Sequence, residues 1–217
     1  MTSVEILEGQ KFGVPWVFFV KGEKIAIVDA GNPGRERAIL RALGKAGIAR
    51  EDVSLLILTH GHIDHCGSAG MLKRMLPVPV AAGWPDAEYI TRGESAPGEA
   101  YGPGDAVQTS RVRYPPVDID LIARQDTSLK SYGIDGEILV TPGHTPGSIS
   151  VAVGDSCLIG DLNITYSYKG QPVTSMNPET YLDIRTSIEK VTAGDRRYLY
   201  PSHGPRLDAR KVREECL

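Results

Sequence analysis

The residues most able to do chemistry in this chain are its five histidines, which lie in three short segments. These segments are Thr59–His65, Thr141–Gly147 and Pro201–Pro205, and most of their other residues are glycine, proline, threonine, serine or aspartate. Imidazole is the commonest metal ligand among protein side chains. Because no histidine lies elsewhere in the sequence, we expect these segments to build one metal site that carries the function.

The first segment concentrates four potential ligands within a few residues. In a loop, side chains two residues apart can face the same ion, whereas Asp64 and His65 are displaced enough to serve a second ion. Zinc usually takes four ligands at about 2.0–2.3 Å, and a catalytic ion keeps one position for water. Two ions roughly 3.5–4 Å apart can present a hydroxide to a substrate carbonyl. The predicted ligands are His60, His62 and His144 for one ion, Asp64, His65 and His203 for the other, and Asp161 as the bridge.

Each of these loops follows a segment that is typical of a β-strand. The strand-like segments are Leu55–Leu58 before His60, Glu137–Val140 before His144, Cys157–Ile159 before Asp161, and Tyr198–Tyr200 before His203. If the strands share sheets and run in the same direction, their loops meet at one sheet edge, where open α/β sheets bind ligands. The order of elements therefore predicts that residues far apart in sequence form a single cluster.

The remaining pattern alternates between strands and helices. Apolar runs at Val14–Val20 and Lys24–Val28 predict a hairpin, and the periodicity from Arg35 to Ala46 predicts a helix that Gly47 ends. Further helices are predicted at 66–76, from Asn177 onward and at 208–215, and further strands at 78–81 and 148–153. This alternation indicates an α/β protein.

One long segment, from Gly83 to Pro116, shows no regular pattern. Such a segment inside a compact domain is usually a functional loop or lid, or else contains an unrecognised helix. Its aromatic residues Trp84, Tyr89 and Tyr101 could line an apolar pocket, but we expect them to pack in the core. Cys66 directly follows His65 and could bind a soft metal, although packing is the favoured interpretation.

Composition limits the classes of partner. The length of 217 residues and the 41% hydrophobic content suit one large domain, residues 1–217. The formal net charge of −3, without a long basic run, argues against nucleic acid as a partner. Three scattered cysteines and the absence of a secretory signal predict a cytoplasmic protein. No apolar run approaches the roughly 20 residues that span a bilayer, so we expect no membrane partner.

In its motifs the chain resembles the metallo-β-lactamase fold superfamily. The resemblance rests on Thr59–His65, Pro142–Ser148, Gly160-Asp161 and Ser202–Gly204, which occur in the order and approximate spacing of that superfamily. It implies a four-layer αββα sandwich of two mixed β-sheets flanked by helices, with the ligand set given above. It also implies that Asp29, which ends an early strand, supports the site from behind the ligands.

The full ligand set with a bridging aspartate resembles the glyoxalase II and lactonase branches, whereas true β-lactamases generally lack that carboxylate. The favoured function is therefore binuclear hydrolysis of a small thioester, lactone or other ester. Asp64 would take up the proton and Asp161 would bridge the ions, which are zinc in the favoured interpretation, with manganese, iron or cobalt as alternatives. Related hydrolases place a tyrosine near the substrate carbonyl, for which Tyr166 and Tyr168 are candidates.

Two other functions use similar ligands. A mononuclear iron persulfide dioxygenase resembles glyoxalase II, and it would hold its iron with His60, His144 and Asp161. A phosphodiesterase or RNA-processing nuclease is less favoured because no basic segment is present to hold the nucleic acid. A small-molecule substrate is therefore the expected partner, and the sequence does not indicate an oligomeric state.

Overall fold

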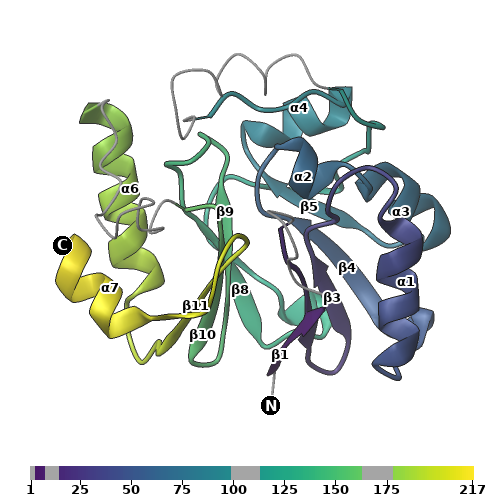
Figure 1. The fold of residues 1–217 in the computed structure, drawn as a ribbon, viewed down its shortest axis with the longest axis horizontal. Helices are drawn as coiled ribbons and strands as arrows, with labels where there is room; N and C mark the ends of the chain where they lie inside the picture. Colours follow the sequence, from purple (N-terminus) through teal and green to yellow (C-terminus); the bar gives the residue numbers. More distant parts are fainter. Residues whose placement is uncertain (1–2, 8–14, 99–112, 163–177) are drawn as a thin grey trace.

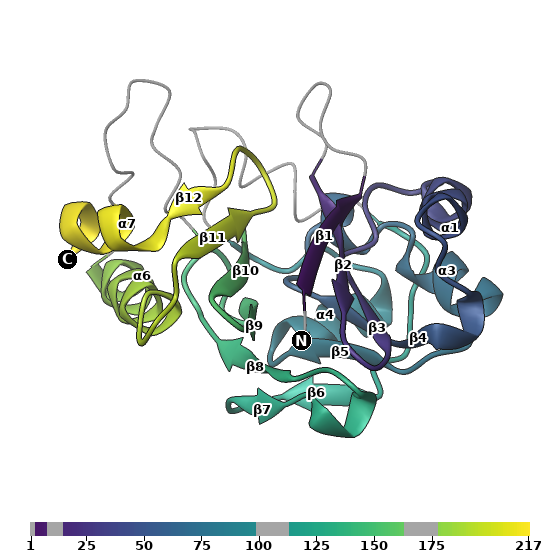
Figure 2. The same ribbon diagram turned by 90° about the horizontal axis from the view of Figure 1, so that it is seen from below.

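The structure is a computed structural model that describes residues 3–7, 15–98, 113–162 and 178–217. Its strands form two six-stranded sheets that face each other, and helices cover the outer face of each sheet (Figure 1). The view from below separates the two halves, with α1 and α3 beside one sheet and α6 and α7 beside the other (Figure 2). The predicted four-layer αββα sandwich of two mixed sheets is confirmed.

The first sheet is formed by the N-terminal half of the chain. In spatial order its strands are β1 (Ser3–Leu7), β2 (Val17–Lys21), β3 (Ile25–Val28), β4 (Val53–Leu58), β5 (Val80–Gly83) and β6 (Leu121–Ala123). β1, β2 and β3 pair antiparallel, and the pairs from β3 to β6 are parallel. The predicted hairpin is thus β2 and β3, and its turn contains Gly22.

The second sheet is formed by the C-terminal half. In spatial order its strands are β12 (Leu207–Asp208), β11 (Tyr198–Pro201), β10 (Ser156–Gly160), β9 (Ile149–Val153), β8 (Gly136–Val140) and β7 (Thr127–Ser128). β10 and β11 pair in parallel, and every other pair is antiparallel. β8, β10 and β11 therefore run in the same direction.

The helices belong to two outer layers. On the first sheet lie α1 (Glu36–Lys45), α2 (Ile63–Cys66), α3 (Ala69–Met75) and α4 (Asp86–Arg92), and on the second lie α6 (Pro178–Val191) and α7 (Ala209–Cys216). Short 3₁₀ turns occur at Arg50–Asp52 and Lys130–Tyr132. Within the described segments, no helix combines the length and the apolar composition needed to cross a bilayer.

The core has three layers, and β4 shows how they arise. Leu56 and Leu58 point toward α1 and α3, whereas Leu55 and Ile57 point between the two sheets, and all four are fully buried. Side chains alternate along a strand, so a continuous apolar run is what a strand covered on both faces requires. A third apolar cluster lies between the second sheet and α6 and α7, and it includes Ile188.

The structure refines three expectations about the elements. The helix predicted at 66–76 is instead two helices, α2 and α3, and between them the Ser68 hydroxyl donates to Asn32 O and accepts from Arg35 N. The irregular stretch contains a helix, α4, which is one of the alternatives stated for it, and Gly93 ends this helix in a left-handed conformation with φ of 68°. The strand predicted at 78–81 lies at Val80–Gly83 as β5, because Asp120 and the neighbouring β6 set its register.

The strands that lead to the histidine loops are divided between the sheets. β4 belongs to the first sheet and β8, β10 and β11 to the second, so the expectation of a shared sheet is only half correct. The sheets nevertheless meet at their loop ends, where Ile149 N donates to Thr59 O at 2.9 Å. Within the second sheet, Ser202 N donates to Gly160 O at 2.8 Å. The predicted convergence at one edge therefore arises from two sheets.

Candidate metal centre

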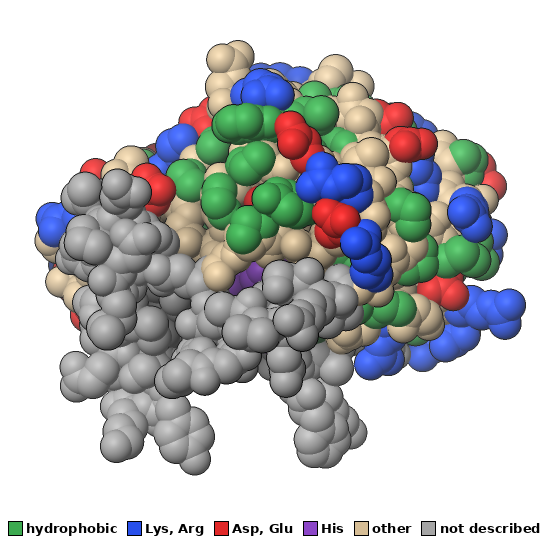
Figure 3. Space-filling view, turned by 90° about the horizontal axis from the view of Figure 1, so that it is seen from above, with side chains coloured by type: hydrophobic (Ala, Val, Ile, Leu, Met, Phe, Trp, Pro, Cys, Tyr) green, Lys and Arg blue, Asp and Glu red, His purple; other side chains and the backbone are tan. Residues whose placement is uncertain are grey.

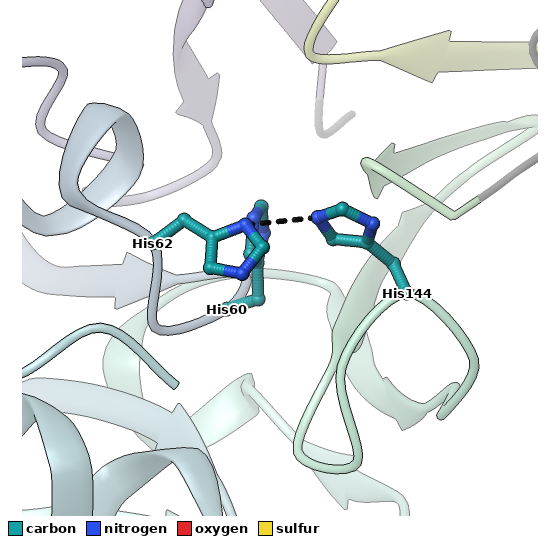
Figure 4. A group of neighbouring side chains, drawn as sticks. All are labelled: His60, His62 and His144. Carbon is teal, nitrogen blue, oxygen red and sulfur yellow. Dashed lines mark hydrogen bonds between the residues drawn. The ribbon is translucent and has the colours of Figure 1, made fainter. Parts of the chain in front are cut away.

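Three buried imidazoles form one compact group, which we call the inner triad: His60, His62 and His144. The first two follow β4 and the third follows β8, and their rings point toward one another (Figure 4). The centroid of each ring lies 4.6–4.7 Å from those of the other two. His62 Nδ1 lies 3.0 Å from His144 Nε2, which brings one nitrogen of each ring toward a common point.

The segment after α4 supports the inner triad from behind. A Cβ atom placed on Gly98 would lie 3.0 Å from His62 Nε2 and 2.6 Å from His144 O, so only glycine permits this approach. Ala96 N also donates to Gly61 O at 3.0 Å. Since Gly98 faces Nε2 of His62, the nitrogen left to face an ion is Nδ1. The described end of the irregular stretch is therefore a wall of the site.

The second group, which we call the outer triad, consists of Asp64, His65 and His203. His203 Nε2 lies 3.2 Å from Asp64 Oδ2, and His65 Nε2 lies 3.7 Å from the same oxygen. The side chains of Asp64 and His203 are 30% and 31% exposed, whereas His65 is fully buried. Seen from above, a small patch of histidine surface appears beside a group of hydrophobic side chains (Figure 3). The outer triad is thus the more solvent-accessible group.

Asp161, in the turn after β10, lies between the two triads. Its Oδ2 atom is 4.0, 3.7, 3.5 and 3.4 Å from the Nε2 atoms of His60, His144, His65 and His203, respectively. One oxygen therefore faces imidazoles of both triads. This is the position that a bridging ligand would occupy.

Several buried polar atoms of the cluster lack a protein partner. Among the described residues, nothing hydrogen-bonds to Nε2 of His60, Nε2 of His65 or Oδ1 of Asp161. Native proteins leave few buried polar groups unpaired, and a bound ion is one recognised explanation for such groups. The nitrogen and oxygen donors converge and are of the types that divalent zinc accepts. The residues present therefore fit a pair of divalent ions.

Burial keeps the inner triad neutral. It lowers the pKa of His144 to about 3 and lowers the pKa of His60 well below its usual value, and the nearby charge of His65 lowers that of His60 further. The pKa of His62 is lowered by the same two causes in the same order. Because the neutral imidazole is the form that binds a metal, the inner triad is ready to bind at neutral pH.

In the outer triad, neighbouring charges determine the pKa values of His65 and Asp64. Burial lowers the pKa of His65, but the carboxylates of Asp161, Asp64 and Asp29 outweigh it and raise that pKa well above the usual value. Conversely, burial raises the pKa of Asp64, but His65 and a hydrogen bond from His203 lower it to about 2. The pKa of Asp161 lies below its usual value because His65 likewise outweighs burial. Without an ion, His65 is therefore an imidazolium among carboxylates.

Asp29 contacts the outer triad directly. Its Oδ2 atom lies 2.8 Å from His65 Nδ1, and its Oδ1 atom accepts from Thr59 N at 2.8 Å. Ser202 Oγ, beside His203, donates to the same carboxylate at 3.3 Å. Asp29 has φ of 65°, a left-handed backbone that aspartate and asparagine tolerate better than most residues. It lies where the sequence predicted a supporting residue, behind a ligand ring.

Two residues that support the loops were missed by the sequence analysis. Asp86, the first residue of α4, is fully buried between the loops of the inner triad. Trp16 holds the His203 loop, because its Nε1 donates to Gly204 O at 3.0 Å and its backbone N to Ser202 O at 2.9 Å. The only sequence signal was weak in each case: a carboxylate at a helix start, and a tryptophan before a strand.

The other predicted residues have mixed outcomes. Cys66 packs in the core and its Sγ donates to His60 O, while burial raises its thiol pKa well above the usual value, in agreement with the packing interpretation. The expectation that Trp84 packs in the core is wrong, because it is 44% exposed under the guanidinium of Arg124. Tyr101, Tyr166 and Tyr168 lie outside the described residues.

Residues 10–203 match the model of the metallo-beta-lactamase superfamily. The chain belongs to this superfamily. It is 28% identical over 195 residues to a probable metallo-hydrolase of Methanocaldococcus jannaschii, covering 86% of each chain. It is 35% identical over 130 residues to the hydroxyacylglutathione hydrolase GloC of Haemophilus influenzae, covering 57% of this chain and 53% of that one.

The solved structures agree on the fold. A metallo-beta-lactamase from Novosphingobium pentaromativorans superposes with a TM-score of 0.68 at 17% identity, covering 93% of this chain and 80% of that one. Similarity at this level of identity reports the fold alone. The superfamily assignment, together with the histidine-rich cluster, supports a metal-dependent hydrolase.

Proposed function

We propose that this chain is a binuclear metal-dependent hydrolase that cleaves a small thioester or ester. The observation that carries the proposal is the position of Asp161 Oδ2, within 4.0 Å of Nε2 atoms from both triads. A mononuclear site built from His60, His144 and Asp161 would not need that oxygen to face His65 and His203 as well. The inner triad would hold one ion, the outer triad the other, and Asp161 both.

When bound, such an ion pair supplies a hydroxide near neutral pH and polarises a carbonyl oxygen. The chain's own residues set the geometry: Asp29 orients the His65 ring through Nδ1, and Gly98 leaves Nδ1 of His62 to face the ion. Asp64 is ionised at neutral pH, since its pKa is about 2. This low pKa favours Asp64 as a ligand and makes it a weak base, because proton acceptors work best with a pKa near the working pH.

The thioester class is supported by the similarity to a hydroxyacylglutathione hydrolase over more than half of the chain. The donor set of imidazoles and carboxylates suits zinc, and also manganese, iron or cobalt. We further propose that the substrate is a small molecule and that the protein works in the cytoplasm. These finer assignments are testable on one purified sample.

The test is metal quantification followed by a substrate panel. We expect two equivalents of divalent metal per chain, hydrolysis of thioesters or lactones, loss of activity after chelation, and recovery with Zn²⁺, Mn²⁺ or Co²⁺. The panel also includes β-lactams, phosphodiesters and, with oxygen uptake as readout, glutathione persulfide. One iron per chain with oxygen consumption would replace the proposal with a dioxygenase, and activity that survives exhaustive chelation would refute metal catalysis.

A further inference from the structure

The buried carboxylate of Asp86 joins the two loops of the inner triad. Its Oδ2 atom accepts from Gly61 N and from Thr145 Oγ1, each at 2.7 Å, and its Oδ1 atom accepts from Gly147 N at 2.9 Å. Gly61 lies between His60 and His62, and Thr145 directly follows His144. One side chain therefore binds both loops that supply the inner imidazoles.

These two loops come from different sheets, and near the ligands they are also joined by the contact between the His62 and His144 rings. The first extends from β4 in one sheet and the second from β8 in the other, so their separation depends on contacts across the sheet ends. The backbone hydrogen bond from Ile149 to Thr59 lies at the bases of these loops. Asp86 acts closer to the ligands, at the residues next to His60, His62 and His144.

The surroundings of Asp86 are packed closely. A Cβ atom on Gly147 would lie 2.5 Å from Asp86 Oδ1, and one on Gly61 would lie 3.3 Å from Asp86 Oδ2 and 2.8 Å from the Cβ of Ala96. The glycine at 147 is therefore required by the approach of the carboxylate. Such packing leaves Asp86 little freedom to move without moving both loops.

The chemistry of the side chain also matches this place. An ionised carboxylate is purely an acceptor, and its three partners here are all donors. Burial raises the pKa of Asp86 to about 6, and the three hydrogen bonds oppose that rise because they stabilise the charged form. An amide in this position would turn a donor toward donors. Asp86 is thus specified by its contacts with the loops.

We propose that Asp86 is a positioning residue that fixes the separation of His62 and His144, and thereby sets the metal affinity of the inner triad. It touches neither ring and would not contact substrate. This inference rests on the proposed binuclear function. It distinguishes the two metal positions, because Gly61 and Thr145 are direct sequence neighbours of inner-triad histidines and no Asp86 partner directly adjoins a residue of the outer triad.

The test uses two variants, each of which removes a histidine ligand from one metal position and keeps the other position intact; we call them the single-position backgrounds. His203→Ala leaves the inner triad intact and His144→Ala leaves the outer triad intact, and Asp86→Asn is introduced into each. Zn²⁺ affinity is measured by competition with a chromophoric chelator. We expect Asp86→Asn to weaken Zn²⁺ binding about 10- to 100-fold in the His203→Ala background, which is the usual range when a group that supports metal ligands is lost. In the His144→Ala background we expect a change within about twofold.

A milder pair of variants covers the case in which Asp86→Asn fails to fold. In the His203→Ala background, Thr145→Val removes the hydroxyl that donates to Asp86 and also lies 2.7 Å from Ser148 Oγ, and it should weaken Zn²⁺ binding about fivefold. Thr145→Ser keeps the hydroxyl and should bind as its parent does. Thermal unfolding of the metal-free proteins is recorded alongside, because a merely structural role would lower Tm without separating the two metal positions.

Failure of the Asp86 assignment can be distinguished from failure of the proposed function. Equal weakening in both backgrounds, or equal affinities for Thr145→Val and Thr145→Ser, would overturn the assignment of Asp86. A wild-type chain that binds no divalent ion would overturn the proposed function and this inference together. A wild-type chain that binds two ions, with no effect of Asp86→Asn on either position, would overturn only the inference.

Discussion

The two halves of the candidate centre are supported in different ways. In the outer half, Asp29 contacts a ligand ring itself, at 2.8 Å from His65 Nδ1. In the inner half, Asp86 contacts only the backbone and a hydroxyl of the loops that carry the ligands. The outer half is partly exposed and rich in charge, whereas the inner half is buried and neutral. In the outer half the supporting carboxylate contacts a ligand ring, and in the inner half it contacts the loops that carry the ligands.

This difference has consequences for metal binding. A preformed neutral triad can take an ion without losing a proton, whereas a triad that contains an imidazolium must release one. Changes at Asp29 should therefore act on the outer triad, and changes at Asp86 should act on the inner one.

The largest effect is expected for Asp161→Ala. Because Asp161 Oδ2 faces imidazoles of both triads, its loss should reduce metal content below two equivalents and lower hydrolysis by more than about 100-fold, the upper range for residues that only support ligands. Metal analysis and activity on the same sample provide the check. Asp52→Ala is the control, because this exposed aspartate pairs with Lys24 and lies at the end of β4 opposite the histidine loop. A variant that keeps both ions would remove the bridging role from Asp161.

The next effect is expected for Asp29→Asn, which removes charge from the outer half. Asparagine tolerates the left-handed backbone at this position, so the substitution isolates the carboxylate. We expect Zn²⁺ affinity of the outer triad, measured in the His144→Ala background, to fall about 10- to 100-fold. The inner triad, measured in the His203→Ala background, should change within about twofold. Equal losses at both positions would erase the proposed distinction.

The third prediction concerns pH. The pKa of His65 is raised, so as pH falls below that pKa a proton competes with the outer ion, and affinity there should fall about tenfold per pH unit. The pKa of His144 is about 3 and that of His60 is also lowered, whereas burial raises the pKa of Asp86 to about 6, so the inner triad should bind almost independently of pH between about 7 and 8 and weaken only as pH falls through about 6. Zn²⁺ competition titrations across this range, in the two single-position backgrounds, measure both slopes. Parallel slopes would contradict the account.

The smallest effect is expected for Trp16→Phe. This change removes the hydrogen bond from Nε1 to Gly204 O and keeps the backbone bond to Ser202 O, so the His203 loop loses one of its two contacts with Trp16. We expect Zn²⁺ affinity of the outer triad to fall about two- to fivefold. Trp84→Phe, at an exposed tryptophan that also hydrogen-bonds through Nε1, should leave it unchanged. The inner triad should respond to neither variant.

The sequence predicted most of the features that depend on residues close together along the chain. The ligand types and their spacing are visible in one short segment, and the strand periods predicted β4, β8 and β10 to within one or two residues. The structure brings all seven predicted ligands into one cluster. Two sheets were expected from the family resemblance, but which strand belongs to which sheet was not predicted, because strand pairing depends on contacts that are distant in sequence.

Asp86 shows why supporting residues escape sequence analysis. Its three partners lie 25, 59 and 61 residues away along the chain. Locally it is only the first residue of a seven-residue helix that follows a proline. The helix itself had signals in Gly93 and an acidic first turn, but it was too short for its period to stand out. A residue that acts by joining two distant loops leaves no pattern in sequence.

The most direct test of the central claim is anomalous diffraction from crystals grown with Zn²⁺. The account predicts two peaks about 3.5 Å apart, one against the inner triad and one against the outer triad, with the Asp161 carboxylate between them. A single peak held by His60, His144 and Asp161 would contradict the binuclear account.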